Sequence, residues 1–155
     1  MAQPIPAGHE GLIPHLVVDN AAQALEFYKK AFGAELIMAM PAPDGRIMHA
    51  EFTVGGRPIY LCDDFPEYGG GQPRSAKALK ASPVTIHQYV RDCDAALKRA
   101  TDAGATVTMP AADMFWGDRY GKVTDPFGHE WSFATHQKDL TPEQIAQAAA
   151  AAFSH

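Results

Sequence analysis

The sequence lacks three features that would place the protein at a membrane, on a nucleic acid or in a disulfide scaffold. No apolar stretch approaches the roughly 20 residues that a membrane helix needs, and the N-terminus has no basic start followed by an apolar run, as a signal peptide would. The net charge is −5, with no cluster of basic residues larger than Lys29-Lys30, which argues against binding to phosphate backbones. The two cysteines, Cys62 and Cys93, indicate a reducing, cytoplasmic environment.

The remaining composition is that of an ordinary globule. Hydrophobic residues make up 46% of the 155 residues and charged residues 20%, so the chain can bury a core. We expect residues 1–10 to be a flexible tail, residues 11–136 to form one domain and residues 137–155 to form a helical extension.

A repeat with an offset of 72 residues runs through that domain. Residues 15–36 and 87–107 both read as a short strand, a helix, a Gly-Ala stop and a second strand. Asn20 and Asp92 occupy matching positions before the two helices, where their side chains can accept the free amide protons of the first turn. The pattern therefore predicts two copies of one structural unit.

Each copy is predicted to fold as strand, helix and three further strands. The linker over residues 65–81 is rich in Gly, Pro and Lys and is predicted to be a flexible loop. Thr141 to Gln144 form a capping box, which predicts a C-terminal helix reaching about Phe153. The predicted elements of the two copies are 11–18, 20–32, 35–40, 46–54 and 57–62, then 84–90, 92–103, 106–109, 118–124 and 129–135.

Alternation along the strands separates a core face from a second, polar face. The predicted core includes Leu12, Leu16, Val18, Met48, Ala50, Phe52, Val54, Ile59, Leu61, Val84, Ile86 and Val90. The opposite face collects His15, His49, Glu51, Tyr60, Cys62, Thr85, His87, Tyr89, Glu130 and Ser132. That face is too polar to be core, so it is either a binding site or a solvated surface.

The duplicated unit and three motifs, "FWGDRYG", "DPFGHEWSFATH" and "LTPEQ", resemble the vicinal oxygen chelate superfamily, and within it the PhnB-like family. The superfamily includes glyoxalases, extradiol dioxygenases and bleomycin resistance proteins. The resemblance spans about residues 11–146 and implies an α+β fold. Two βαβββ repeats would form a curved, partly open mixed sheet, followed by a C-terminal helix. It also implies a homodimer whose cleft is built across two chains.

The resemblance further implies where a metal would be held, and those positions carry poor ligands. They fall at Ile13, Tyr60, Thr85 and Ser132. His15 and His87 lie two residues beyond Ile13 and Thr85, on the same face, and are related by the repeat. A shifted site for one divalent metal (Zn, Fe or Mn) could use this pair with Cys62 or Glu130. Alternatively, the two histidines hydrogen-bond within a polar pocket or reach solvent.

Two acids on the polar face could move protons. Glu51 and Glu130 would act as general bases if the cleft raises their pKa values toward neutrality; the alternative is that they accept hydrogen bonds from neighbouring histidines. His49, Tyr60 and Ser132 are candidate contacts for a substrate.

A loop before the last two strands offers a possible clamp for an anion. Arg119 could bind a carboxylate or phosphate while Trp116 covers it; the alternative is that Arg119 pairs with Asp118 or Asp125. In the "DPFGHEWSFATH" motif, His129 is expected to face away from Glu130, and His136 lies at the end of a strand.

Two functions remain open from the sequence. The first is an enzyme of the lyase, isomerase or dioxygenase kind acting on a small oxygenated molecule, with Glu51 or Glu130 moving the proton. The second is a metal-free protein that sequesters a small molecule, as bleomycin resistance proteins do. Loss of the usual ligands favours the second function, whereas the histidines and acids of the polar face favour the first.

Overall fold

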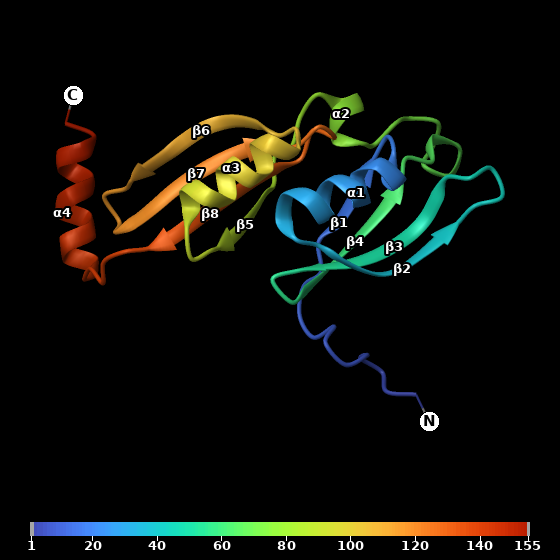
Figure 1. Cartoon of the computed structure of the whole chain (residues 1–155), viewed down its shortest axis with the longest axis horizontal. Helices are drawn as coiled ribbons and strands as arrows, with labels where there is room; N and C mark the ends of the chain where they lie inside the picture. The colour runs from blue at the N-terminus through green and yellow to red at the C-terminus, as the bar shows by residue number, and fades with distance from the viewer. Residues whose placement is uncertain (1, 155) are drawn as a thin grey trace.

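The computed structural model describes residues 2–154 and contains the predicted repeat as two βαβββ units, which lie side by side (Figure 1). The first unit comprises β1 (His15–Val18), α1 (Ala21–Phe32), β2 (Glu35–Pro41), β3 (Ile47–Val54) and β4 (Arg57–Asp63). The second comprises β5 (Thr85–Tyr89), α3 (Cys93–Ala103), β6 (Thr106–Asp113), β7 (Asp118–Thr124) and β8 (Glu130–His136). The order of elements matches the prediction in both units.

The strands form two separate four-stranded mixed sheets. Their orders are β1-β4-β3-β2 and β5-β8-β7-β6, with a parallel β1–β4 pair in one and a parallel β5–β8 pair in the other. Between the units, α1 contacts α3, and no strand of one sheet lies against a strand of the other within residues 2–154. Each helix therefore covers one face of its own sheet, while the opposite face is left without a helix.

Local sequence fixes the ends of the two long helices. The side chain of Asn20 accepts a hydrogen bond from the amide of Gln23, and Asp92 accepts one from Ala95, as expected of N-caps. Gly33 closes α1 with φ of 66°, in the left-handed region that residues with a Cβ avoid.

The segments outside the repeats are more ordered than predicted. The linker carries a 3₁₀ turn, η1 (Pro66–Tyr68), and a short helix, α2 (Ala76–Leu79), although its composition predicts a flexible loop. The C-terminal helix α4 (Pro142–Ala152) begins with the predicted capping box between Thr141 and Gln144. No helix found in residues 2–154 has the length and apolar character that crossing a membrane requires.

The aspartate of the "DPFGHEWSFATH" motif ties the two units together. Asp125 is 4% exposed and accepts hydrogen bonds from the Tyr28 hydroxyl of α1 at 2.7 Å and from the Trp131 indole at 2.9 Å. Its other oxygen accepts from the amides of Phe127 and His129. A buried carboxylate is stable only when its lone pairs are satisfied in this way, so the motif serves the fold.

The predicted core is largely confirmed, with three errors. Leu12, Met48 and Val84 are exposed, by 101%, 51% and 68%. Leu12 and Val84 precede the strands to which they were assigned, so no sheet face orients them. Met48 sits where the β2–β3 register shifts and the alternation breaks, so that Ile47 is buried in its place.

Candidate functional site

Histidine and aromatic side chains, together with Glu51 and Ser132, gather on the uncovered face of each sheet. We call these two groups the first-sheet cluster and the second-sheet cluster. The first-sheet cluster consists of His15, His49, Glu51 and Tyr60. The second-sheet cluster consists of His87, Tyr89, Trp116, Tyr120 and Ser132. All but Trp116 and Tyr120 follow from the predicted alternation of the strands, and the structure confirms that Leu16, Phe52 and Leu61 face the opposite way, into the core.

In the first-sheet cluster, strand register brings three rings and one carboxylate together. His15 lies opposite Tyr60 in the β1–β4 pair, and Glu51 lies opposite Tyr60 in the β3–β4 pair. The Tyr60 ring centroid is 4.7 Å from that of His49 and 6.0 Å from that of His15, in edge-to-face geometry. Burial lowers the pKa of His15, helped by the neighbouring His49 and Arg74, which favours a neutral imidazole at neutral pH.

A residue from the N-terminal segment completes this cluster. His9 Nε2 lies 2.8 Å from Glu51 Oε1, and the His9 ring lies 6.2 Å from that of Tyr60. The carbonyl of Ala7 and the carboxylate of Glu51 raise the pKa of His9. This contact could not be predicted from the sequence, because His9 belongs to no strand and has no counterpart in the repeat.

In the second-sheet cluster, His87 is held by hydrogen bonding and ring packing. Its Nδ1 lies 2.8 Å from Ser132 Oγ, which is its register partner across the β5–β8 pair. The His87 ring stacks on Tyr120 at 6.0 Å and meets the edge of Tyr89 at 5.0 Å. Trp116 extends the row, 5.7 Å from Tyr120.

A buried carboxylate supports one end of that row. Asp118 is 4% exposed and accepts hydrogen bonds from Tyr89 at 2.9 Å, Trp116 at 3.1 Å and His136 at 2.8 Å. Burial opposes the charge of Asp118, but these three bonds outweigh it and lower the pKa of the carboxyl. Asp118 therefore fixes the orientation of two rings in the second-sheet cluster.

His136 also belongs to the hydrogen-bond network of Asp118, although the sequence predicts only that it lies at the end of a strand. Its second ring nitrogen lies 2.9 Å from Asp139, and the hydrogen bonds to Asp139 and Asp118 raise the pKa of His136. Only the β7–β8 register, which sets Asp118 opposite His136, reveals the pair, and the sequence alone does not give it.

The two candidate general bases lie in different surroundings. Glu130 pairs with Lys122 at 2.8 Å and accepts a hydrogen bond from Thr85 at 3.2 Å. The bond to Lys122 lowers the pKa of Glu130, so this carboxyl does not have the raised pKa that a general base would need. Glu51, in contrast, contacts His9 of the N-terminal segment and not a lysine of a neighbouring strand.

Arg119, the candidate anion clamp, already forms ion pairs with carboxylates of the same chain. Arg119 pairs with Asp94 and Asp113, and neither Asp118 nor Asp125, the partners that the sequence suggested, contacts it. Trp116 donates to Asp118 and faces the row of rings instead of Arg119. An anion would have to displace two carboxylates to reach this guanidinium.

The residues at the four positions implied for a metal do not fit one. Isoleucine has no donor atom at Ile13, and the hydroxyls of Thr85 and Ser132 are bonded to Glu130 and His87. Tyr60 is a weak ligand for a divalent ion unless it loses its proton. In residues 2–154 no group of three or more His, Cys, Asp or Glu side chains is arranged to hold a metal ion.

The two histidines of the shifted site, His15 and His87, lie in different units of the chain. The ring neighbours of His15 are His49 and Tyr60 of the first unit, whereas those of His87 are Tyr89 and Tyr120 of the second. The two histidines belong to separate sheets. Within residues 2–154 no ring contact joins His15 to His87.

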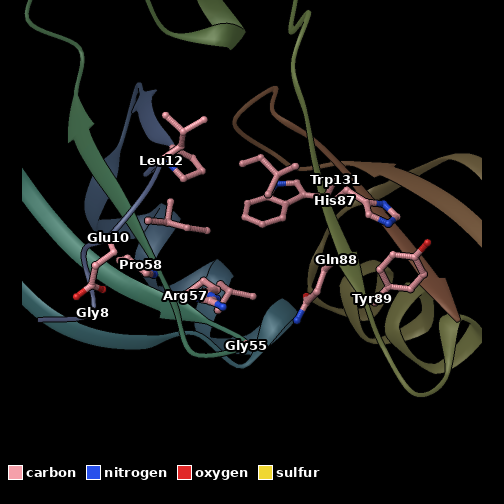
Figure 2. Close-up of a pocket in the computed structure, with 14 residues that line it drawn as sticks. Gly8, Glu10, Leu12, Gly55, Arg57, Pro58, His87, Gln88, Tyr89 and Trp131 are labelled. Atoms are coloured by element: carbon pink, nitrogen blue, oxygen red, sulfur yellow. The ribbon is translucent and has the colours of Figure 1, made fainter. Parts of the chain in front are cut away.

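A cleft of about 480 Å³ runs between the two units (Figure 2). His87, Tyr89 and Trp131 line it from the second unit, and Arg57 and Leu12 line it from the first. Its size suits a small molecule. Because His87 also belongs to the second-sheet cluster, the cleft and that cluster are continuous.

The two cysteines play no part in a disulfide. Cys62, on the same face as the first-sheet cluster, and Cys93, buried at the first position of α3, are both free thiols. Burial raises the pKa of each, so neither is an activated nucleophile at neutral pH.

With this geometry, the chain matches one large superfamily. The family model described as Glyoxalase/Bleomycin resistance protein/Dioxygenase superfamily matches residues 12–133, and the chain belongs to that family.

Its relatives are proteins of similar length. An uncharacterized protein of Mycobacterium tuberculosis (strain H37Rv), Rv0887c, is 46% identical over 137 residues, which cover 88% of this chain and 81% of that protein. The crystal structure of the Arabidopsis thaliana product At5g48480 is 32% identical, with a TM-score of 0.65, covering 80% of this chain and 97% of that one. A PhnB protein from Bacillus cereus shares the fold at 13% identity, with a TM-score of 0.58, over 81% of this chain and 99% of that one.

Proposed function

We propose that this protein binds a small, oxygen-bearing aromatic molecule without a metal ion at the positions usual in the superfamily. The observation that carries the proposal is the second-sheet cluster, where the metal positions Thr85 and Ser132 hold hydroxyls that bond to Glu130 and His87. A row of rings stands beside those hydroxyls. Rings of this kind bind a planar ligand by stacking and edge contacts.

The second-sheet cluster supplies both kinds of contact that such a ligand needs. Tyr120 and Trp116 are half-buried and present ring surface. His87 and Lys122 supply hydrogen-bond donors for oxygen atoms, since each carries an N–H group, and the buried Ser132 holds the His87 ring in place. A few placed polar groups within a largely aromatic wall are typical of small-molecule sites.

A second copy of the chain would complete the site. We infer a homodimer in which the first-sheet cluster of one chain faces the second-sheet cluster of the other, because each cluster lies on a sheet face that no helix within residues 2–154 covers. Sedimentation at micromolar concentration is expected to show a dimer, and a monomer alone would contradict the inference. The cytoplasmic location expected from the two cysteines stays a prediction.

The direct test is a titration with catechol and salicylate, followed by tryptophan fluorescence, to which Trp116 of the cluster and Trp131 of the cleft wall both contribute. Binding is expected to be the same before and after treatment with a chelator. Tyr120→Ala should weaken it about tenfold, since loss of a stacking contact is worth roughly 1 to 1.5 kcal/mol. Val107→Ala, on the exposed strand β6 outside the cluster, is the control and should bind as the wild type does. Binding that disappears with the chelator would contradict the proposal.

A metal-dependent enzyme is the second candidate, and one observation favours it. His15 is a half-exposed histidine whose lowered pKa keeps the imidazole neutral, as a metal ligand must be. In the inferred dimer it could meet His87 of the partner chain, and Glu51 would then be the carboxylate beside them. When bound, a divalent ion would supply Lewis acidity for a developing oxyanion. Metal content separates the two candidates.

A further inference from the structure

The N-terminal segment before β1 contains no helix or strand over residues 2–14, yet one of its side chains is held in place on the first sheet. His9 and Glu51 are in contact, and their side chains are only 21% and 13% exposed. The neighbours of His9 in the chain, Gly8 and Glu10, are exposed. Within the described residues, this imidazole holds the segment to the first sheet together with the carbonyl of Pro14, next to β1, which accepts a hydrogen bond from the amide of Tyr60.

The hydrogen bonds of this imidazole define its chemical form. Nδ1 lies 3.1 Å from the carbonyl oxygen of Ala7, and Nε2 lies 2.8 Å from the carboxylate of Glu51. A carbonyl oxygen and a carboxylate can only accept, so both ring nitrogens must donate. The group seated on the first-sheet cluster is therefore an imidazolium, a planar cation with two N–H donors.

The receiving surface fits that chemistry. In the part of the chain that the structure describes, the only hydrogen bond to the Glu51 carboxylate comes from His9. The ring of Tyr60 lies beside both groups, at 6.2 Å from His9, and His49 follows at 4.7 Å from Tyr60. A half-buried carboxylate that loses its partner is left unsatisfied, so removing His9 leaves a place for another N–H donor.

We propose that residues 7–10 form a strap over the first-sheet cluster, and that His9 occupies the position taken by a planar, N–H-bearing group of the ligand. The proposal rests on the proposed function and adds to it the chemistry of one end of the ligand. That end is a nitrogen heterocycle, which donates to Glu51 and packs against Tyr60. In the inferred dimer, the oxygen-bearing end meets the second-sheet cluster of the partner chain.

The strap also forms one wall of the inter-unit cleft. Gly8, Glu10 and Leu12 line that cleft (Figure 2), while His9, between them, is bonded to Glu51. Successive residues thus face the cleft and the first-sheet cluster in turn. A ligand that displaces His9 must also shift this wall of the cleft. The strap therefore links the cleft to the first-sheet cluster.

The test uses 4-methylimidazole, the free form of the histidine side chain, as a probe for the vacated position. Wild-type protein and the variants His9→Ala and His9→Ala/Glu51→Gln are titrated with it, and the backbone amide resonances of Glu51 and Tyr60 are followed by NMR. His9→Ala is expected to bind the probe about three- to fivefold more tightly than the wild type, since the strap no longer competes for a partly exposed carboxylate. The added Glu51→Gln change should abolish the gain.

Ile5→Ala is the matched control, because Ile5 lies on the same segment and is 60% exposed; it should bind the probe as the wild type does. Equal affinity in the wild type and His9→Ala, or a gain that survives Glu51→Gln, would overturn the strap. Salicylate binding, followed by tryptophan fluorescence, tests the proposed function separately. Salicylate binding without a gain in His9→Ala refutes the strap alone, and a gain without salicylate binding refutes the proposed function alone.

Discussion

The two repeats have the same order of elements and the same strand pairing, but their uncovered faces are held in place by different means. In the second unit, Asp118 anchors Tyr89, Trp116 and His136 through hydrogen bonds within the sheet and its border. In the first unit, the corresponding cluster has no buried carboxylate of that kind, and Glu51 is satisfied from outside the repeat by His9.

This difference shows which parts of a duplicated fold can differ between its two copies. The helix-covered faces of both sheets must pack, so their apolar positions are fixed by burial. The uncovered faces carry no such demand, and each unit has acquired its own polar network there. The rings of the second unit are held by a buried carboxylate, whereas Glu51 of the first unit is held by one side chain of the proposed strap.

The largest expected effect concerns the contact that joins the units. Asp125→Ala should lower the free energy of unfolding by about 3 kcal/mol, because it removes a buried acceptor and leaves the Tyr28 hydroxyl and the Trp131 indole without a partner. Tyr28→Phe removes one of those donors and should cost about 1 kcal/mol. Urea denaturation measures both, and equal, small losses would show that Asp125 does not join the units.

An intermediate effect is the opposite pH dependence of one histidine from each unit. The folded-state pKa of His136 is raised, so the stability that it contributes is complete below its unfolded pKa of about 6.5 and is lost as pH rises through the raised value. The folded-state pKa of His15 is lowered by burial, so protonation of the unfolded chain costs stability as pH falls below about 6.5.

His136→Ala should therefore lower the free energy of unfolding more at pH 5.5 than at pH 9. For His15→Ala, the free energy of unfolding relative to that of the wild type should be higher at pH 5.5 than at pH 9. Thermal unfolding at the two pH values measures both. The same pH trend in the two variants would contradict the assignment of these histidines to different surroundings.

The smallest expected effect is that of the ion pair between Lys122 and Glu130. Both side chains are partly exposed, at 27% and 29%, so Lys122→Ala should change the free energy of unfolding by less than about 1 kcal/mol. The pKa of Glu130 should rise toward its ordinary value when the cation is removed. NMR titration of the Glu130 carboxyl measures this, and an unchanged pKa would mean that Lys122 does not lower it.

The fold could be predicted from the sequence because its signals are periodic and occur twice. The offset of 72 residues, the caps Asn20 and Asp92, and the capping box at Thr141 are local patterns, and each marks an element that the structure contains. The prediction for Met48 is wrong because a bulge shifts the phase of its strand where β3 pairs with Met40 and Pro41 of β2, and that pairing cannot be read from the β3 sequence.

The candidate site could be predicted only in part. Alternation placed His15, Tyr60, His87 and Ser132 on the uncovered faces, but it did not show that the two sets belong to separate sheets. The partners that define the clusters, among them His9 and Asp118, come from distant segments, and their contacts depend on register and chain path. These are set by tertiary packing, which a single sequence pattern does not encode.

Metal content tests the central claim most directly. Untagged protein, purified without a chelator, is analysed for zinc, iron and manganese together with the variants His15→Ala and His87→Ala. Binding without a metal at the usual positions predicts far less than one ion per chain in all three samples. A full equivalent of metal in the wild type that is lost in both variants would contradict it and would establish the histidine pair as a metal site across two chains.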